Sequence, residues 1–160
     1  MTADQVSKIK MIVFDVDGTL TDGGLYVLES GEEMKKFNVK DGMAIARLQK
    51  QGYVFGLISG SKGQGAIHHR AQHLGIEHVY VGSRDKVAVL NEWLAQLNLT
   101  PAQVLFVGDD LSDVAVMQHC GLSACPADAV EAVQQVADWV TKRKGGEGCF
   151  RELADQFWVL

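Results

Sequence analysis

The chain lacks several features that define whole classes of protein. It contains no run of 18 apolar residues, which argues against a membrane-spanning helix. Its first ten residues, MTADQVSKIK, lack the apolar stretch of a secretory signal. Positive charge is scarce: 15 Lys and Arg residues stand against 20 Asp and Glu, a net charge of −5 that disfavours a nucleic-acid partner. No repeat, low-complexity tract or linker interrupts the 160 residues, so we expect a single domain over 1–160.

Cysteine is also sparse. The three cysteines, Cys120, Cys125 and Cys149, are odd in number and form no CxxC pair, which argues against a disulfide framework and against a zinc site. A reducing cytoplasm is the simplest setting for such thiols. What remains is ordinary: 47% apolar and 22% charged residues indicate a soluble globular protein with a sizeable core.

Short apolar runs alternate with segments of helical periodicity. We expect strands at 9–14, 54–58, 78–81, 104–107, 122–124 and 139–141, and helices at 41–49 (with Asp41 as N-cap), 64–74, 85–97, 112–119, from about 127 and from about 150. A β-hairpin is expected where 25–29 and 34–37 flank a turn. This alternation predicts an α/β fold, a doubly wound (Rossmann-like) parallel sheet with a protruding β-hairpin and no separate cap domain.

Acidic residues follow the expected strands at their carboxyl ends. Asp15 and Asp17 come after the first strand, and Asp109, Asp110 and Asp113 come after the fourth. Because the carboxyl ends of parallel strands meet at one edge of a sheet, these carboxylates are expected to share a crevice. Like charges at such short range require a cation, and ligands that are all oxygen favour Mg²⁺.

The same edge offers partners for a phosphate group. Ser59 and Gly60 end the second long strand, where a hydroxyl and exposed N–H groups suit a phosphate oxygen. Lys86 begins a helix and can bring a positive charge to a transferring group, and Thr19 adds a donor. One aspartate can act as a nucleophile and the other, two residues on, as a general acid.

These residues also carry a resemblance. The segments DVDGTLTDG (15–23) and GDDLSD (108–113), with Ser59 and Lys86, resemble the four motifs of the haloacid dehalogenase phosphatases. FNVKDGMAI (37–45), VGDDLSDVAVM (107–117) and GGEGCFRE (145–152) are similar to those members of the family that act on 3-deoxy-D-manno-octulosonate 8-phosphate or on a nine-carbon ketodeoxy sugar acid phosphate. The resemblance extends from about Lys8 to the last helix.

The resemblance implies roles for individual residues. Asp15 matches the nucleophile, which is also a Mg²⁺ ligand, and Asp17 matches the general acid/base, whose backbone carbonyl also binds the metal. Asp109 matches the remaining protein ligand, and Asp110 and Asp113 match supporting acidic positions. Ser59 and Lys86 match the pair of residues that binds the phosphoryl group. It also implies a homotetramer. In it the hairpin flap (about 24–37) and a C-terminal tail (about 145–160) from the neighbouring subunit close the active site, with the Gly145–Gly148 segment flexible enough to reach out.

The sequence leaves open which sugar acid phosphate is the substrate. Thr19, Gly60, Arg70 and Arg151 are candidate substrate-binding residues, and Arg151 suits a carboxylate. Relatives that act on the eight-carbon substrate usually carry Thr-Gly-Arg where this chain has Ser59-Gly60-Ser61, so an arginine suited to binding an anion is missing here. Lys62 or the 68–70 stretch can compensate. His68, His69 and His73 are read as a polar helix face rather than a metal site.

Together these features predict a Mg²⁺-dependent phosphatase that acts on a sugar acid phosphate through an aspartyl-phosphate. Two non-enzymatic alternatives remain. One is a signalling receiver domain, which also clusters aspartates, a hydroxyl and a lysine on a small doubly wound sheet. The other is a catalytically idle tetramerising module. The acid/base position Asp17 and the hairpin after it favour an enzyme over the receiver.

Overall fold

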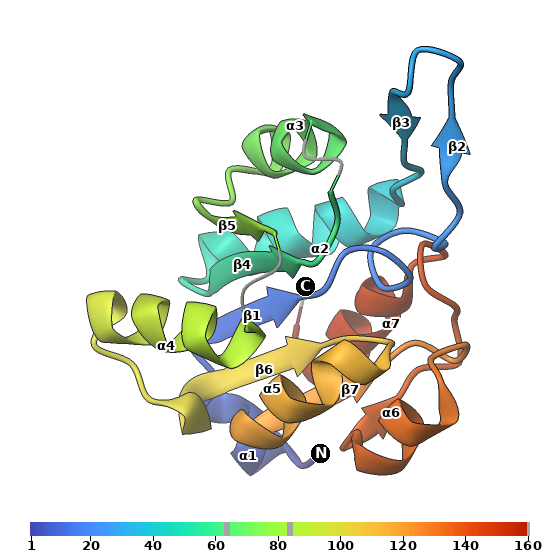
Figure 1. The fold of residues 1–160 in the computed structure, drawn as a ribbon. Coiled ribbons are helices and arrows are strands. Elements are labelled where there is room, and N and C mark those ends of the chain that lie inside the picture. Colours follow the sequence, from blue (N-terminus) through green and yellow to red (C-terminus); the bar gives the residue numbers. More distant parts are fainter. Residues whose placement is uncertain (63–64, 83–84, 160) are drawn as a thin grey trace.

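The computed structural model describes residues 1–62, 65–82 and 85–159. Its centre is a sheet of parallel strands in the order β5-β4-β1-β6-β7-β8 (Figure 1). The strands are β1 (Met11–Phe14), β4 (Val54–Ser59), β5 (His78–Val81), β6 (Val104–Val107), β7 (Leu122–Cys125) and β8 (Trp139–Val140). The chain winds outward from β1 to β5 and then returns to the other side of β1 with β6. This order confirms the doubly wound, Rossmann-like fold.

Helices cover both faces of the sheet and create two cores. One face carries α1 (Ala3–Ser7), α2 (Val39–Lys50), α3 (Gly65–Leu74) and α7 (Cys149–Phe157); the other carries α4 (Lys86–Leu97), α5 (Val114–His119) and α6 (Glu131–Val136). Strand β1 serves both, since Ile12 and Phe14 enter the first core and Met11 and Val13 the second. Burial on both faces explains why the strands read as continuous apolar runs. In the described ranges no helix combines the length and apolar character needed to cross a bilayer.

A β-hairpin projects from the carboxyl edge of the sheet (Figure 1). Its strands β2 (Tyr26–Val27) and β3 (Glu33–Met34) pair antiparallel, and a bridge between Thr21 and Phe37 fixes its base. We call residues 24–37 the flap. No other insertion within the described residues folds as a unit of its own, so the expectation of a flap without a separate cap domain is confirmed.

Several element boundaries differ from the expectation. Asp41 is not the N-cap of α2, because Asn38 takes that place and its side chain accepts a hydrogen bond from the Lys40 amide at 2.9 Å. The helix expected from about 127 begins at Glu131, and the one expected from 112 starts with a 3-10 turn, η2 (Leu111–Asp113). A second such turn, η1 (Pro101–Gln103), precedes β6, and helix α1 was not predicted.

Candidate active site

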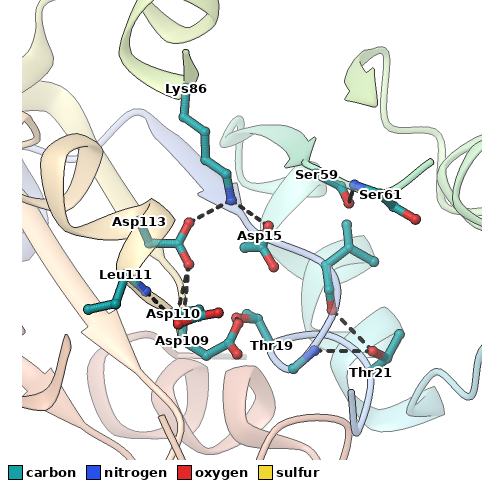
Figure 2. Close-up of polar contacts among 12 residues, drawn as sticks. Asp15, Thr19, Thr21, Ser59, Ser61, Lys86, Asp109, Asp110, Leu111 and Asp113 are labelled. Atoms are coloured by element: carbon teal, nitrogen blue, oxygen red, sulfur yellow. Dashed lines mark hydrogen bonds and ion pairs between the residues drawn. The ribbon is translucent and has the colours of Figure 1, made fainter. Parts of the chain in front are cut away.

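The carboxyl ends of β1, β4 and β6 bring distant residues together. Phe14 lies opposite Leu57 of β4 and Val107 of β6, and the Asp15 amide donates to the Val107 carbonyl at 2.9 Å. Asp15 therefore leaves the sheet between the end of β4 and the loop after β6. Figure 2 shows Asp15 with Ser59, Lys86, Asp109 and Asp113 around it. The convergence expected from the strand ends is present.

Lys86 connects two of these carboxylates. Its Nζ lies 2.5 Å from Asp15 Oδ1 and 2.6 Å from Asp113 Oδ1 (Figure 2). The three side chains are nearly inaccessible, with 8%, 10% and 0% of their surface exposed for Lys86, Asp15 and Asp113. Asp113 Oδ2 accepts from the amides of Asp109 and Asp110, at 3.0 and 3.2 Å. Since both oxygens of Asp113 are engaged, this residue braces Lys86 and the loop after β6.

Asp109 is held from the loop that follows β1. The Thr19 hydroxyl donates to Asp109 Oδ1 at 2.8 Å. Gly18 passes so close that a Cβ there would overlap the Asp109 carboxylate, and its φ of +89° also favours glycine. Asp15, Asp109 and Asp113 each present a carboxylate oxygen within 4.8 Å of the other two. The glycine of the DxDGT motif is thus required for the close approach of two acidic loops.

The cluster carries more negative than positive charge. Burial raises the pKa of Asp15 to about 7; Lys86 opposes this rise and Asp113 adds to it. Burial, together with neighbouring Asp113 and Asp110, raises the pKa of Asp109 to about 6 against the Thr19 hydrogen bond. For Lys86, burial lowers the pKa, but Asp15 and Asp113 outweigh it and the pKa lies above its usual value. One ammonium facing three carboxylates creates a site that favours a further cation.

The donor set of this site fits Mg²⁺. Every candidate ligand atom is an oxygen, which suits a hard cation. Asp15 and Asp109 are the best placed, because hydrogen bonds already occupy both oxygens of Asp113. No histidine in the described part of the chain joins such a group.

The predicted phosphate-binding residues lie beside Asp15. Ser59 is buried at the end of β4, and its Oγ accepts from the Ser61 amide at 3.1 Å. Open space surrounds the Cα of Gly60, so its backbone is accessible to a ligand. Thr19 is fully buried and bonded to Asp109; a direct contact between Thr19 and substrate stays a prediction. Asp110 is exposed and caps η2 through the Leu111 amide.

The two candidate arginines lie outside the carboxylate cluster. Arg70 stacks over Phe37, 5.7 Å from the ring centroid, and its Nη2 lies 3.4 Å from the Asn38 carbonyl oxygen at the start of α2. Arg151 pairs with Asp155 one turn along α7, at 2.8 Å. The structure does not bring either guanidinium to Asp15 or Asp17 within this chain. Their contact with substrate stays a prediction.

The glycine-rich segment 145–148 packs on its own chain instead of reaching out as expected. The Gly146 amide donates to the Thr19 carbonyl at 3.1 Å, and Asn38 Nδ2 donates to the Gly146 carbonyl at 3.2 Å. A Cβ on Gly145 would overlap the Gly18 carbonyl oxygen. The glycines therefore allow close contact with the loop after β1, which contains Gly18 and Thr19.

Two contacts around the site have no signal in the sequence. Lys35, next to β3 in the flap, places its Nζ 2.6 Å from Asp17 Oδ1. Asp41, only 2% exposed, accepts from the Arg151 amide at 2.8 Å and so ties α2 to α7. The sequence does not distinguish Lys35 from its neighbour Lys36, and only the geometry of the hairpin shows which of them contacts Asp17.

Comparison with known proteins supports the family resemblance that the sequence motifs indicate. The sequence model of the haloacid dehalogenase-like hydrolase family matches residues 70–153 of this chain. The 3-deoxy-D-manno-octulosonate 8-phosphate phosphatase of Yersinia pestis is 40% identical over 151 residues, which are 94% of this chain and 80% of that protein. Its crystal structure superposes with a TM-score of 0.92 at 39% identity, covering 97% of this chain and 83% of that one.

A second solved structure carries ligands. The 3-deoxy-D-manno-octulosonate 8-phosphate phosphatase of Moraxella catarrhalis, in complex with a magnesium ion, a phosphate ion and a KDO molecule, has a TM-score of 0.92 and 30% identity, covering 97% of this chain and 88% of that one. These matches favour an enzyme over the receiver-like and idle alternatives. The chain belongs to the haloacid dehalogenase-like hydrolases and resembles, over nearly its whole length, the 3-deoxy-D-manno-octulosonate 8-phosphate phosphatases among them.

Proposed function

We propose that this chain, a phosphoric monoester hydrolase by family, hydrolyses a sugar acid phosphate of the 3-deoxy-D-manno-octulosonate 8-phosphate type in a Mg²⁺-dependent reaction. The observation that carries the proposal is the convergence of Asp15, Lys86, Asp109 and Asp113 at one edge of the sheet. The relatives at about 40% identity supply the substrate class.

Asp15, Asp109 and the backbone carbonyl of Asp17 are the proposed ligands of the metal. When bound, Mg²⁺ would neutralise charge on the phosphoryl group and on the two carboxylates. Lys86 stays between Asp15 and Asp113, where it adds a fixed positive charge beside the nucleophile. Ser59 and the backbone after it offer donors to the phosphoryl oxygens.

The reaction proceeds in two displacements at phosphorus. Asp15 attacks the phosphorus atom, the bond to the sugar oxygen breaks, and Asp17 gives its proton to that oxygen. An aspartyl-phosphate then remains on Asp15. Asp17, now a carboxylate, takes a proton from water, the water oxygen attacks phosphorus, and inorganic phosphate leaves with Asp15 restored.

The substrate's sugar acid has a candidate cavity beside Asp17. A cavity of about 600 Å³ lies between the flap and α3 and is lined by Met34, Lys35, Lys62 and His69, among others. Its size is in the range of small-molecule sites. Lys62, the residue after Ser61, brings a positive charge to this cavity, whereas eight-carbon relatives usually carry arginine at the position of Ser61, and this keeps a nine-carbon substrate as the alternative.

The exposed apolar residues of the flap support the proposed homotetramer. Leu25, Tyr26 and Val27 expose 56%, 54% and 63% of their surface, an apolar cluster that is unusual unless a second chain covers it. A Tyr26→Lys, Val27→Lys variant should lower the molar mass measured by light scattering to that of smaller species. An unchanged tetramer, or a wild-type chain that is already monomeric, contradicts this assembly.

Phosphate release tests the activity. We expect turnover of 3-deoxy-D-manno-octulosonate 8-phosphate, or of the nine-carbon ester, far above that of glucose 6-phosphate, and loss of turnover in EDTA with recovery on adding Mg²⁺. Asp15→Asn should abolish turnover, whereas Asp22→Asn, in the same loop but paired with Lys36 at 2.8 Å, should retain it. Full activity of Asp15→Asn, or activity indifferent to EDTA, would refute the mechanism.

A further inference from the structure

Two neighbouring lysines of the flap have opposite environments. Lys35 has 1% of its side chain exposed and contacts Asp17 at 2.6 Å, while Lys36 has 58% exposed and contacts Asp22 at 2.8 Å. An ammonium is buried at a considerable cost unless a carboxylate compensates it. Lys35 therefore occupies a site with Asp17 as its near partner and Glu33 Oε2 more distant at 3.9 Å, whereas Lys36 forms an ordinary surface pair.

The flap fixes Lys35 from both sides. Met34, the preceding residue, pairs with Tyr26 in the hairpin, and Phe37, two residues on, bridges to Thr21 at the flap's base. Thr21 belongs to the same loop as Asp17. The backbone on either side of Lys35 is thus tied to the hairpin and to the loop that carries Asp17, and the side chain, only 1% exposed, is packed with its ammonium at Asp17.

The contact distinguishes the two oxygens of Asp17. Lys35 binds Oδ1, and within the described residues no other side chain bonds to this carboxylate. A lysine ammonium has three donors and no acceptor. With Lys35 bound at Oδ1, Oδ2 is the oxygen of Asp17 that remains available to the leaving group.

We propose that Lys35 is a positioning residue for Asp17: it holds Oδ1 and so leaves Oδ2 as the oxygen that meets the leaving sugar oxygen. This inference rests on the proposed function, in which Asp17 is the general acid. It makes the flap part of the catalytic machinery of its own chain, in addition to any role in assembly or substrate choice.

The test compares leaving groups. Because kcat/KM reports the steps up to departure of the leaving group, it isolates proton donation by Asp17. An alkoxide needs that proton, and p-nitrophenolate does not. In Lys35→Met we expect kcat/KM to fall about 10- to 100-fold for both 3-deoxy-D-manno-octulosonate 8-phosphate and glucose 6-phosphate, mainly through kcat, and to stay within about threefold for p-nitrophenyl phosphate.

Two matched variants complete the design. Lys36→Met should leave all three substrates unaffected, and Lys35→Arg should recover most of the loss. A loss confined to the sugar acid phosphate, seen in KM, would instead mean that Lys35 binds the substrate carboxylate. An equal loss for all three substrates would mean that the flap has lost its structure. Either result overturns the inference.

If the wild-type chain does not hydrolyse the sugar acid phosphate, the proposed substrate is wrong. The comparison of glucose 6-phosphate with p-nitrophenyl phosphate still tests the role of Lys35.

Discussion

Replacing Lys86 by methionine tests whether the buried ion cluster stabilises the site. Methionine keeps the length of the side chain and removes its charge. Asp15 and Asp113 then lose the ammonium at 2.5 and 2.6 Å while their side chains stay at most 10% exposed. Removing one partner of a buried ion pair costs about 3–5 kcal/mol, so we expect the free energy of unfolding to fall by about that amount at pH 8 in EDTA.

The loss in the free energy of unfolding should change with pH in a defined direction. Lys86 lowers the pKa of Asp15, which burial raises to about 7, so the variant's Asp15 binds a proton at still higher pH. A neutral carboxyl is cheaper to bury than a carboxylate. The difference between wild type and variant should therefore shrink from pH 8 to pH 5.

Urea unfolding followed by tryptophan fluorescence measures the difference, with protein concentration held constant because assembly also stabilises the fold. Lys36→Met is the matched control, since its pair with Asp22 is exposed and should matter little. The double variant Lys86→Met, Asp113→Asn should recover part of the loss, because one buried charge is gone. A Lys86→Met protein as stable as the control, or a loss that grows toward pH 5, would refute this reasoning.

Three further predictions follow from the packing around the site. Gly145→Ala should reduce both activity and melting temperature, because its Cβ overlaps the Gly18 carbonyl oxygen, while Gly65→Ala, in open space, should change neither in the assays above. Gly18→Ala should lose Mg²⁺ affinity in calorimetry, since the new methyl group displaces the Asp109 carboxylate; unchanged affinity contradicts this. Burial raises the pKa of Asp41 from 3.8 to about 6, so the folded state takes up a proton that the unfolded state does not, and the free energy of unfolding should fall by about 2 kcal/mol from pH 4 to pH 6. Asp41→Asn should remove this component, and an unchanged pH profile in urea melts would count against it.

The sequence by itself determined the sheet and the identity of the acidic residues. Apolar runs such as 12–14 and 104–107 have one stable environment, a strand covered on both faces, and their alternation with helical segments leaves few topologies. Since parallel strands end at a common edge, Asp15, Ser59 and Asp109 could be placed together before any coordinates. Lys86 could be assigned from its place at the start of a helix and from the resemblance.

Only the tertiary structure decided how these residues are held. Asp113 is indistinguishable in sequence from a metal ligand, and its two engaged oxygens assign it to bracing Lys86. Asp41 has the character of an N-cap, yet the amide of Arg151, which it binds, lies 110 residues away in sequence. Lys35 became a partner of Asp17 because the hairpin register turns it inward and Lys36 outward. Local patterns determine which residues are buried and at which end of a strand they lie, whereas the pairing of charges depends on contacts between segments whose separation is fixed only when the chain folds.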